Sequence, residues 1–342
     1  MLSVIDIRDG NWIEFVKQSP GATLFHHPSW SICLSQTYGY RPFVVVMKDS
    51  DGQILAGLPV MEINSWLTGN RWVSLPFSDH CSPLFNNEND LELFCHELVH
   101  KNMEFNSPGI EIRQKLPPLD GIVRKNSYFI HYLKLDEKQE ELFKKFRKKG
   151  VQYCIKKAAK SDIDITQSTE LESLMTFYNL HLMTRKKHGV PIQPKKYFVK
   201  LWEHIINQGM GFVMLAHHKD KTIAGGVFLH YNKDMIYKYG AADPAYMNLY
   251  GTYALLWEAI QWGCNNNYEI MDWGKTEKNN QGLRNFKLGW GTEEKELIYS
   301  YIGTAPKEYS TGWKQKVVEK VIKKSPVSVG RILGEIFYKH VG

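Results

Sequence analysis

Residues 236–291 constrain the fold more than any other stretch of the sequence. Side chains in Ile236–Ala241 alternate between two faces, as in a strand, and a Pro/Asn-rich loop then ends at Asn248. From Gly251 to Cys264, apolar residues recur at three- and four-residue spacing, which predicts a helix. A short strand, Tyr268–Met271, is expected next, followed by a polar loop. The stretch therefore predicts a strand, loop, helix and strand in an α/β fold.

This order of elements places a helix N-terminus beside the carboxyl end of a strand. The free N–H groups of the first helical turn and the positive end of the helix dipole then favour a phosphate. No GxxxxGK[ST] phosphate loop is present, and Gly251-Thr252 alone is a weak signal. An ordinary crossover helix is the competing interpretation.

Composition indicates a globular protein whose cysteine thiols are reduced. The chain has 342 residues, of which 43% are hydrophobic and 13% aromatic, enough for two domains that each bury a core. The five cysteines are scattered and form no CxxC pair, which favours reduced thiols in a cytosol. The N-terminus lacks a signal-peptide layout, and no apolar run reaches the ~18 residues that span a bilayer. We therefore expect a cytoplasmic protein.

The net charge of +7 is concentrated in two segments. Residues 144–160 carry eight Lys or Arg and no acid, and residues 313–339 carry seven Lys or Arg against two acids. Both segments could bind anionic partners or could be solvated helix faces. The second is also amphipathic, which suits either the inner face of an anionic membrane or docking on the protein itself.

One hairpin pattern occurs twice. Residues 43–57 align with residues 212–226 without a gap, at an offset of 169. A helix is expected before each copy, near 29–37 and near 195–207. The pattern predicts two copies of one α/β unit, although a match this short can also arise by chance.

Residues 96–100 read His-Glu-Leu-Val-His, the HExxH signature of zinc proteases, on a helix expected at 90–105. No second motif supplies a convincing third ligand, and the helix has an apolar face typical of packing. We therefore predict no metal.

Residues 75–84, LPFSDHCSPL, form the best candidate for chemistry in the first half of the chain. Pro76 and Pro83 bracket the segment, which predicts a loop. Asp79 and His80 could accept a proton from an amine, or could only hold the loop together. Cys81 is interpreted as structural.

Several motifs together resemble the Fem-like branch of the GNAT acyltransferase superfamily, which includes peptidoglycan aminoacyl transferases and exopolysaccharide-associated acetyltransferases. The residues that carry this resemblance are Asp272-Trp273-Gly274, Gly282-Leu283, Phe286-Lys287, Trp290-Gly291, the 75–84 segment, Phe146-Arg147-Lys148-Lys149 and Ile155-Lys156-Lys157-Ala158. The resemblance implies an α/β (α+β) fold of two tandem GNAT-like domains with mixed central sheets. We expect an N-terminal domain at 1–134, the acyltransferase domain at 135–304 and basic amphipathic helices at 305–342.

The function that follows is N-acyl transfer from an activated donor to an amine acceptor in cell-envelope or polysaccharide biosynthesis. Acyl-CoA is the favoured donor, because the 75–84 segment resembles the exopolysaccharide-associated branch. Aminoacyl-tRNA is the alternative donor, and a non-catalytic adaptor that binds RNA or membrane is the alternative function. The acceptor amine could belong to a sugar, a peptide or a lipid-linked precursor.

The predicted site residues fall into three groups. Lys287 matches the Phe-Lys motif of the family and would place positive charge on the transition state, with Asp79 or His80 as proton acceptor; the alternative for Lys287 is a salt bridge to Asp272. Phosphates of donor or acceptor would bind Arg147, Lys148 and Arg284. The donor-binding backbone is predicted at Gly240, Ala241, Ala242, Gly251 and Thr252.

Overall fold

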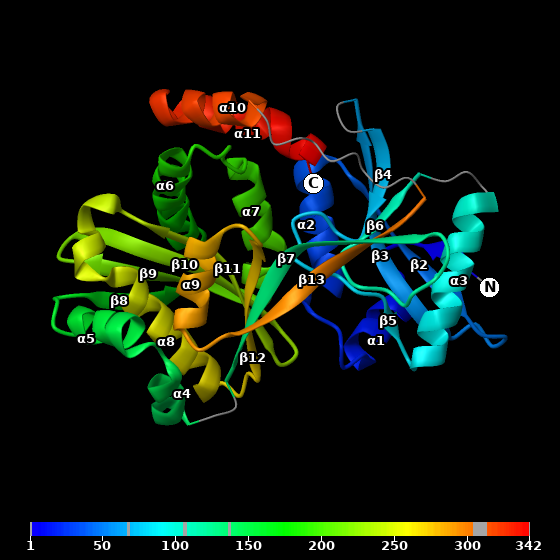
Figure 1. Cartoon of the computed structure of the whole chain (residues 1–342), viewed down its shortest axis with the longest axis horizontal. Helices are drawn as coiled ribbons and strands as arrows, with labels where there is room; N and C mark the ends of the chain where they lie inside the picture. The colour runs from blue at the N-terminus through cyan, green and yellow to red at the C-terminus, as the bar shows by residue number, and fades with distance from the viewer. Residues whose placement is uncertain (1, 67–68, 105–107, 136–137, 304–312, 342) are drawn as a thin grey trace. The chain divides into compact units, whose positions relative to one another are not determined.

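The computed structural model describes residues 2–66, 69–104, 108–135, 138–303 and 313–341, and it divides into two compact units (Figure 1). The first unit comprises residues 1–128, 296–310 and 336–342, and the second comprises residues 129–295 and 311–335. Asp136, whose spacing from Gln139 in the sequence resembles a capping box, lies outside the described residues. Three elements contribute to both units: β7 (Ile122–Lys134), β13 (Glu293–Ile302) and α11 (Val327–Val341).

The first unit is a mixed sheet packed with helices. Its strands follow the order β1-β2-β3-β4-β6-β13, with β5 paired to β3, and β4 and β6 are parallel. The elements of this unit are β1 (Leu2–Ile5), α1 (Gly10–Gln18), η1 (Leu24–His26), α2 (Pro28–Tyr38), β2 (Arg41–Lys48), β3 (Ile54–Ser65), β4 (Gly69–Val73), β5 (Leu84–Phe85), α3 (Glu88–Glu104) and β6 (Ile110–Ile112).

Local sequence signals explain where these helices begin and end. The Asp9 carboxylate accepts a hydrogen bond from Asn11 N at 2.8 Å and caps α1. Pro28 occupies the first turn of α2, and Gly39 ends that helix in the left-handed conformation, with φ +79°. Burial of Trp12 against Gly57 of β3 then fixes α1 on the sheet, since a Cβ at Gly57 would lie 2.7 Å from the indole.

The second unit has a sheet in the order β7-β12-β11-β10-β9-β8, in which β11 and β12 are parallel and β11, β10, β9 and β8 pair antiparallel. Its further elements are α4 (Gln139–Lys145), the π-helical turn η2 (Lys148–Gln152), α5 (Tyr153–Ala158), β8 (Asp164–Ser168), α6 (Leu171–His188), α7 (Lys195–His204), η3 (Ile206–Gln208), β9 (Gly211–His218), β10 (Lys221–Tyr231), β11 (Asp234–Ala242), η4 (Pro244–Leu249), α8 (Gly251–Asn265), β12 (Ile270–Glu277), α9 (Gln281–Gly289) and α10 (Trp313–Lys324).

Helices α6 and α8 cover opposite faces of this sheet. A Cβ at Gly225 would lie 3.0 Å from Phe177 of α6, and a Cβ at Gly226 would lie 3.0 Å from Leu255 of α8. Because consecutive residues of a strand point to opposite faces, the two helices sandwich β10. The Gly-Gly pair thus allows both helices to approach the sheet closely.

The predicted fold class is confirmed, and both expected hairpins are present as β2–β3 and β9–β10, each preceded by a helix. Two elements differ from expectation. The strand expected at Tyr268–Met271 continues to Glu277, because Trp273 and Thr276 are buried despite the polar sequence around them. Residues 281–289, expected as loop, form α9, which Asn280 caps by accepting from Leu283 N at 3.2 Å.

Candidate functional site

The parallel strands β11 and β12 separate in the middle of the second unit. Their ladder pairs Asp234–Ile236 with Ile270–Asp272 and does not continue along residues 237–242 and 273–277, all of which the structure describes. Residues 237–242 and 273–277 are therefore not paired with each other at the carboxyl ends of the two strands, where α/β proteins commonly bind ligands. We call this unpaired stretch the opening between β11 and β12.

Two backbone irregularities accompany this separation. Gly274 has φ +70°, a conformation that glycine adopts easily, and its N–H donates to Asp272 Oδ1 at 2.7 Å. On β11, Tyr237 pairs with Phe228 and Tyr239 with Val227, so Lys238 is an extra residue in a β-bulge. A bulge changes the direction of a strand's peptide groups. The bulge at Lys238 and the positive φ of Gly274 therefore both alter the backbone where β11 and β12 stop pairing.

The first turn of α8 follows β11 and η4 in the chain. Tyr250 adopts φ +61° before the helix, and its carbonyl accepts from Tyr253 N and Ala254 N at 2.9 and 3.2 Å. Within the described chain, the N–H groups of Gly251 and Thr252 have no acceptor. Gly251 itself is required by packing, because a Cβ there would lie 2.9 Å from Ile223. The expected helix N-terminus is thus present with unpaired donors.

Part of the first basic segment lies next to this turn. Helix α5 packs on α8, with Tyr153 in edge contact with Tyr250 at 6.3 Å. Arg147 is tied to α9, since its N–H donates to Gly289 O at 2.8 Å and its guanidinium donates to Asn285 O at 3.2 Å. Burial raises the pKa of the Tyr253 hydroxyl, and the charge of Arg147 opposes that rise. Arg147 and Lys148 remain exposed cations.

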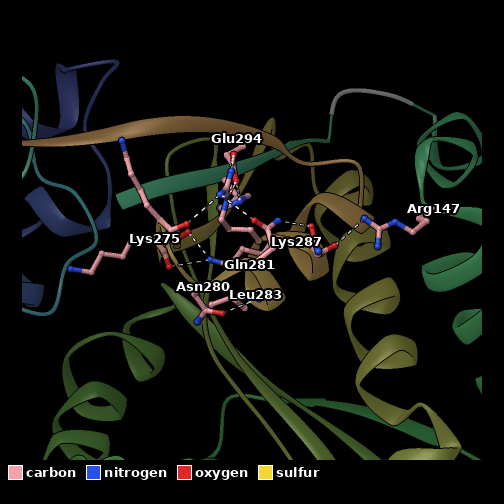
Figure 2. A network of polar contacts seen from close by, with 12 residues as sticks. Arg147, Lys275, Asn280, Gln281, Leu283, Lys287 and Glu294 are labelled. Atoms are coloured by element: carbon pink, nitrogen blue, oxygen red, sulfur yellow. Dashed lines mark hydrogen bonds and ion pairs between the residues drawn. The ribbon is translucent and has the colours of Figure 1, made fainter. Parts of the chain in front are cut away.

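Lys287 lies beside the separated part of β12. Its side chain is only 5% exposed, and Nζ donates to Gly274 O at 2.8 Å and to Lys275 O at 3.2 Å (Figure 2). The side chain therefore links α9 to the first peptide groups of β12 beyond the parallel ladder. These two carbonyls are partners that the sequence did not indicate.

Glu294 organises a second set of contacts in the same unit. Arg284 donates to both of its carboxylate oxygens, at 2.9 and 2.8 Å, and stacks on Phe129 with 4.2 Å between the guanidinium carbon and the ring centre. This hydrogen bonding raises the pKa of Arg284 and lowers the pKa of Glu294. A phosphate at Arg284 would therefore compete with Glu294.

His131 completes this network. It is fully buried, and its Nε2 lies 3.0 Å from Glu294 Oε2. Burial, and then the charge of Lys287, lower its pKa, so the imidazole is neutral near pH 7 and Nε2–H donates. Among described atoms, Nδ1 has no partner. No sequence motif indicates this pairing, since the two residues are 163 positions apart.

Asp79 and His80 belong to the first unit, whereas Lys287 belongs to the second. Leu75 and Phe77 in their loop have φ of +61° and +60°, unusual for residues with side chains. The loop is held by Trp30 Nε1 donating to Ser78 Oγ at 2.9 Å and by Tyr299 Oη donating to Asp79 O at 2.7 Å. His80 contacts Phe25 edge-on at 5.5 Å.

The HExxH motif lies in α3, as expected for a helix. In the part of the chain that is described, no group of three His, Cys, Asp or Glu is arranged to hold a metal ion. Of the described helices, none is both long enough and apolar enough to cross a bilayer.

Comparisons with known proteins find one family match and several similar folds. Residues 144–293 match the family model of the acetyltransferase (GNAT) domain. The fold is similar to that of FemX, with TM-score 0.69 and 14% identity over 94% of this chain and 100% of that chain. It is also similar to L-PGS from Bacillus licheniformis, with TM-score 0.55 and 14% identity over 94% and 99% of the two chains.

A third similar structure is a tandem GNAT protein from the clavulanic acid pathway, with TM-score 0.52 and 9% identity over 89% of this chain and 100% of that chain. No curated protein sequence matches the chain. At these identities the structural likeness shows the fold alone. The expected resemblance to the GNAT superfamily is confirmed for residues 144–293 by the family model, and the expected Fem-like resemblance is confirmed in the fold.

Proposed function

We propose that the protein transfers an acyl group from acyl-CoA, bound by the second unit, to an amine, in the synthesis of a cell-envelope or polysaccharide component. The observation that carries this proposal is the separation of β11 from β12 next to the unpaired N–H groups of Gly251 and Thr252. A thioester lying between the strands would pair with their peptide groups, while its diphosphate would meet the α8 N-terminus. Arg147 and Lys148 would add positive charge.

The reaction needs no covalent enzyme intermediate. The neutral amine attacks the thioester carbonyl carbon, the tetrahedral oxyanion collapses, and coenzyme A leaves as a thiolate that takes a proton. Peptide N–H groups of β11, from Gly240 to Ala242, would hold the donor, although Ala242 N already donates to Thr184 Oγ1 at 3.3 Å. Lys287 contributes a buried positive charge, which acts more strongly on an oxyanion there than in water.

Proton removal from the amine is assigned to Asp79 or His80 in this proposal. A carboxylate or a neutral imidazole can accept a proton from an amine, and this chemistry is the argument for the role. Mutation of each residue tests it. The acceptor is proposed to be an amine on a sugar, a peptide or a lipid-linked precursor.

Aminoacyl-tRNA is the second candidate donor. The observation that favours it is the exposed basic side chains of Arg147, Lys148, Lys149, Lys156 and Lys157, around helix α5. A row of cations can follow a nucleic-acid backbone, and such binding weakens steeply as salt rises.

Calorimetric titration with acetyl-CoA tests the proposal. Thr252→Glu puts a carboxylate at the first turn of α8, where it stabilises the helix but repels a diphosphate. We expect saturable acetyl-CoA binding by the wild type at ~0.15 M salt and at least tenfold weaker binding by Thr252→Glu. Thr176→Glu, the same change on α6, is the matched control and should bind as the wild type does.

A parallel titration with charged and uncharged tRNA separates the alternatives. Tight, salt-sensitive binding of tRNA without binding of acetyl-CoA would contradict the acyl-CoA proposal and move the donor to aminoacyl-tRNA. If neither binds, a non-catalytic adaptor becomes the leading function.

A further inference from the structure

Helices α6 and α10 and the turn η4 form one surface of the second unit, which we call the α6–η4–α10 surface. It consists of Met183 and Lys187 on α6, Met247 on η4, and Lys320, Val321 and Lys324 on α10. All six side chains are exposed, Met247 to 58%, Val321 to 42% and Met183 to 40%. Figure 1 shows α10 lying across the end of α6.

Close packing holds α10 in this position. Gly189 ends α6 with φ +69°, and a Cβ there would lie 2.5 Å from Glu319 Cγ and 2.7 Å from Glu319 O. Only glycine therefore allows α10 to lie on this turn. Ile322 is buried, 3.6 Å from the Cβ position of Gly330. With Ile322 turned inward, Lys320, Val321 and Lys324 point to solvent.

The other part of the surface joins α6 to the candidate site. Lys187 and Met183 are one turn apart on α6, and Lys187 Nζ lies 3.7 Å from Met247 Sδ on η4. One turn before Lys187, Thr184 Oγ1 accepts from Ala242 N at the end of β11. Because η4 connects β11 to α8, the surface borders the opening proposed to hold the donor.

The chemistry of the surface fits an anionic bilayer. The surface carries three exposed cations and three exposed apolar side chains, and the nearby carboxylate of Glu319 is paired with Lys323. Lysines bind lipid phosphates while aliphatic groups enter the headgroup boundary. A nucleic-acid surface instead uses aromatic side chains on which bases stack, and the exposed apolar members here are Met and Val.

We propose that the α6–η4–α10 surface docks on a membrane that contains anionic lipid. Docking brings the opening between β11 and β12 to the membrane, so that an amine carried on a lipid can reach it. Access of a lipid-carried amine to the opening rests on the proposed function. Docking of the surface on the membrane does not.

Co-sedimentation with vesicles tests docking without any donor. At ~0.15 M salt the full-length protein should bind vesicles of phosphatidylcholine with 30% phosphatidylglycerol and should not bind phosphatidylcholine alone. Each lysine removed should weaken binding about fivefold, so Lys187→Gln/Lys320→Gln/Lys324→Gln should weaken it about 100-fold. Lys233→Gln is the control, because Lys233 lies at the other end of β11, and it should bind as the wild type does.

A second variant tests the aliphatic side chains. Met247→Gln/Val321→Gln keeps all charges and should weaken binding roughly tenfold. The proposal is overturned if the wild type does not prefer anionic vesicles, if the lysine variant still binds them tightly, or if the aliphatic variant binds like the wild type. It is also overturned if the lysine substitutions weaken only tRNA binding. Vesicle binding without acetyl-CoA binding would contradict the proposed donor instead, so the two failures are distinguishable.

Discussion

At the scale of single residues, Lys287 has two separable roles. Its ammonium satisfies the carbonyls of Gly274 and Lys275, and it places charge beside the opening. Lys287→Ala should lower the free energy of unfolding by about 2–4 kcal/mol, since two carbonyls lose their charged donor in a buried setting. Urea denaturation measures this loss. If the proposed reaction is correct, kcat of the folded variant should also fall by about 10²–10³.

Lys295→Ala is the control for this prediction, because Lys295 is a cation on β13 whose Nζ lies over the ring of Tyr132, at 5.8 Å, and forms no ion pair among the described residues. Its unfolding free energy should change by less than about 0.5 kcal/mol. A Lys287→Ala protein with reduced stability and unchanged kcat would leave Lys287 with a structural role only.

The residues around Lys287 show which parts of a candidate site can be predicted from a sequence. Lys287 was predicted because it stands in a recognisable Phe-Lys motif. Glu294 and His131 were not, because their contact depends on strands far apart in the sequence. Neither residue stands in a motif, and His131 is a lone histidine in a strand. Arg284 was identified as a cation, but its bidentate partner Glu294 was not foreseen.

At the scale of elements, the separation of β11 and β12 was not predicted, although each strand was. Alternation of side chains locates a strand but does not say where its pairing with a neighbour stops. The start of α8 at Gly251 was predicted correctly, because apolar spacing and loop residues mark it. Helix α9 was missed, since glycines at both ends weaken its pattern.

Gly240, predicted to bind the donor, has a packing role in β11. A Cβ there would lie 1.7 Å from the hydroxyl oxygen of Tyr237. The Tyr237 ring stacks on Phe228 and contacts Trp273, so it cannot move without disturbing the start of the opening. Gly240→Ala should therefore cost about 1–3 kcal/mol of unfolding free energy, measured by urea denaturation.

Tyr237→Phe removes the hydroxyl, so Gly240→Ala should cost about 1 kcal/mol less in that background. Gly282→Ala is the matched control, because the nearest atom to its Cβ would be 3.9 Å away, and it should be neutral or slightly stabilising. Equal costs of Gly240→Ala in both backgrounds would show that Tyr237 is not the source of the strain.

At the scale of the whole molecule, the repeated hairpin was the signal that revealed two α/β units. The boundaries between the compact units fall inside β7 and β13, at 128/129 and 295/296. The domain boundaries predicted from the sequence follow residues 134 and 304. Sequence patterns mark where a strand begins and ends, but they do not say with which unit each half of it packs. The domain boundaries after residues 134 and 304 therefore remain a prediction, which limited proteolysis can test by locating the cleavage sites.

Each unit contains a buried neutral histidine that should make its stability depend on pH. His26 in the first unit accepts from Thr23 N at Nδ1, 3.0 Å, and donates from Nε2 to Ser82 O, 2.9 Å. His181 in the second unit donates from Nε2 to Gln193 Oε1 at 2.9 Å. Burial lowers the pKa of each to about 4.

The sign of the effect follows from these pKa values. Between pH 6.5 and 4 the unfolded chain binds a proton at each histidine and the folded chain does not, so acid favours unfolding. Stability is full above pH 6.5 and falls as the pH drops, by about 2 kcal/mol per histidine between pH 7 and 5. His181→Gln should reduce this loss in the second unit alone, and His26→Gln in the first alone. Hydrogen exchange of peptides from residues 2–128 and 129–295 measures the two units separately, and equal pH slopes for wild type and variants would contradict the assignment.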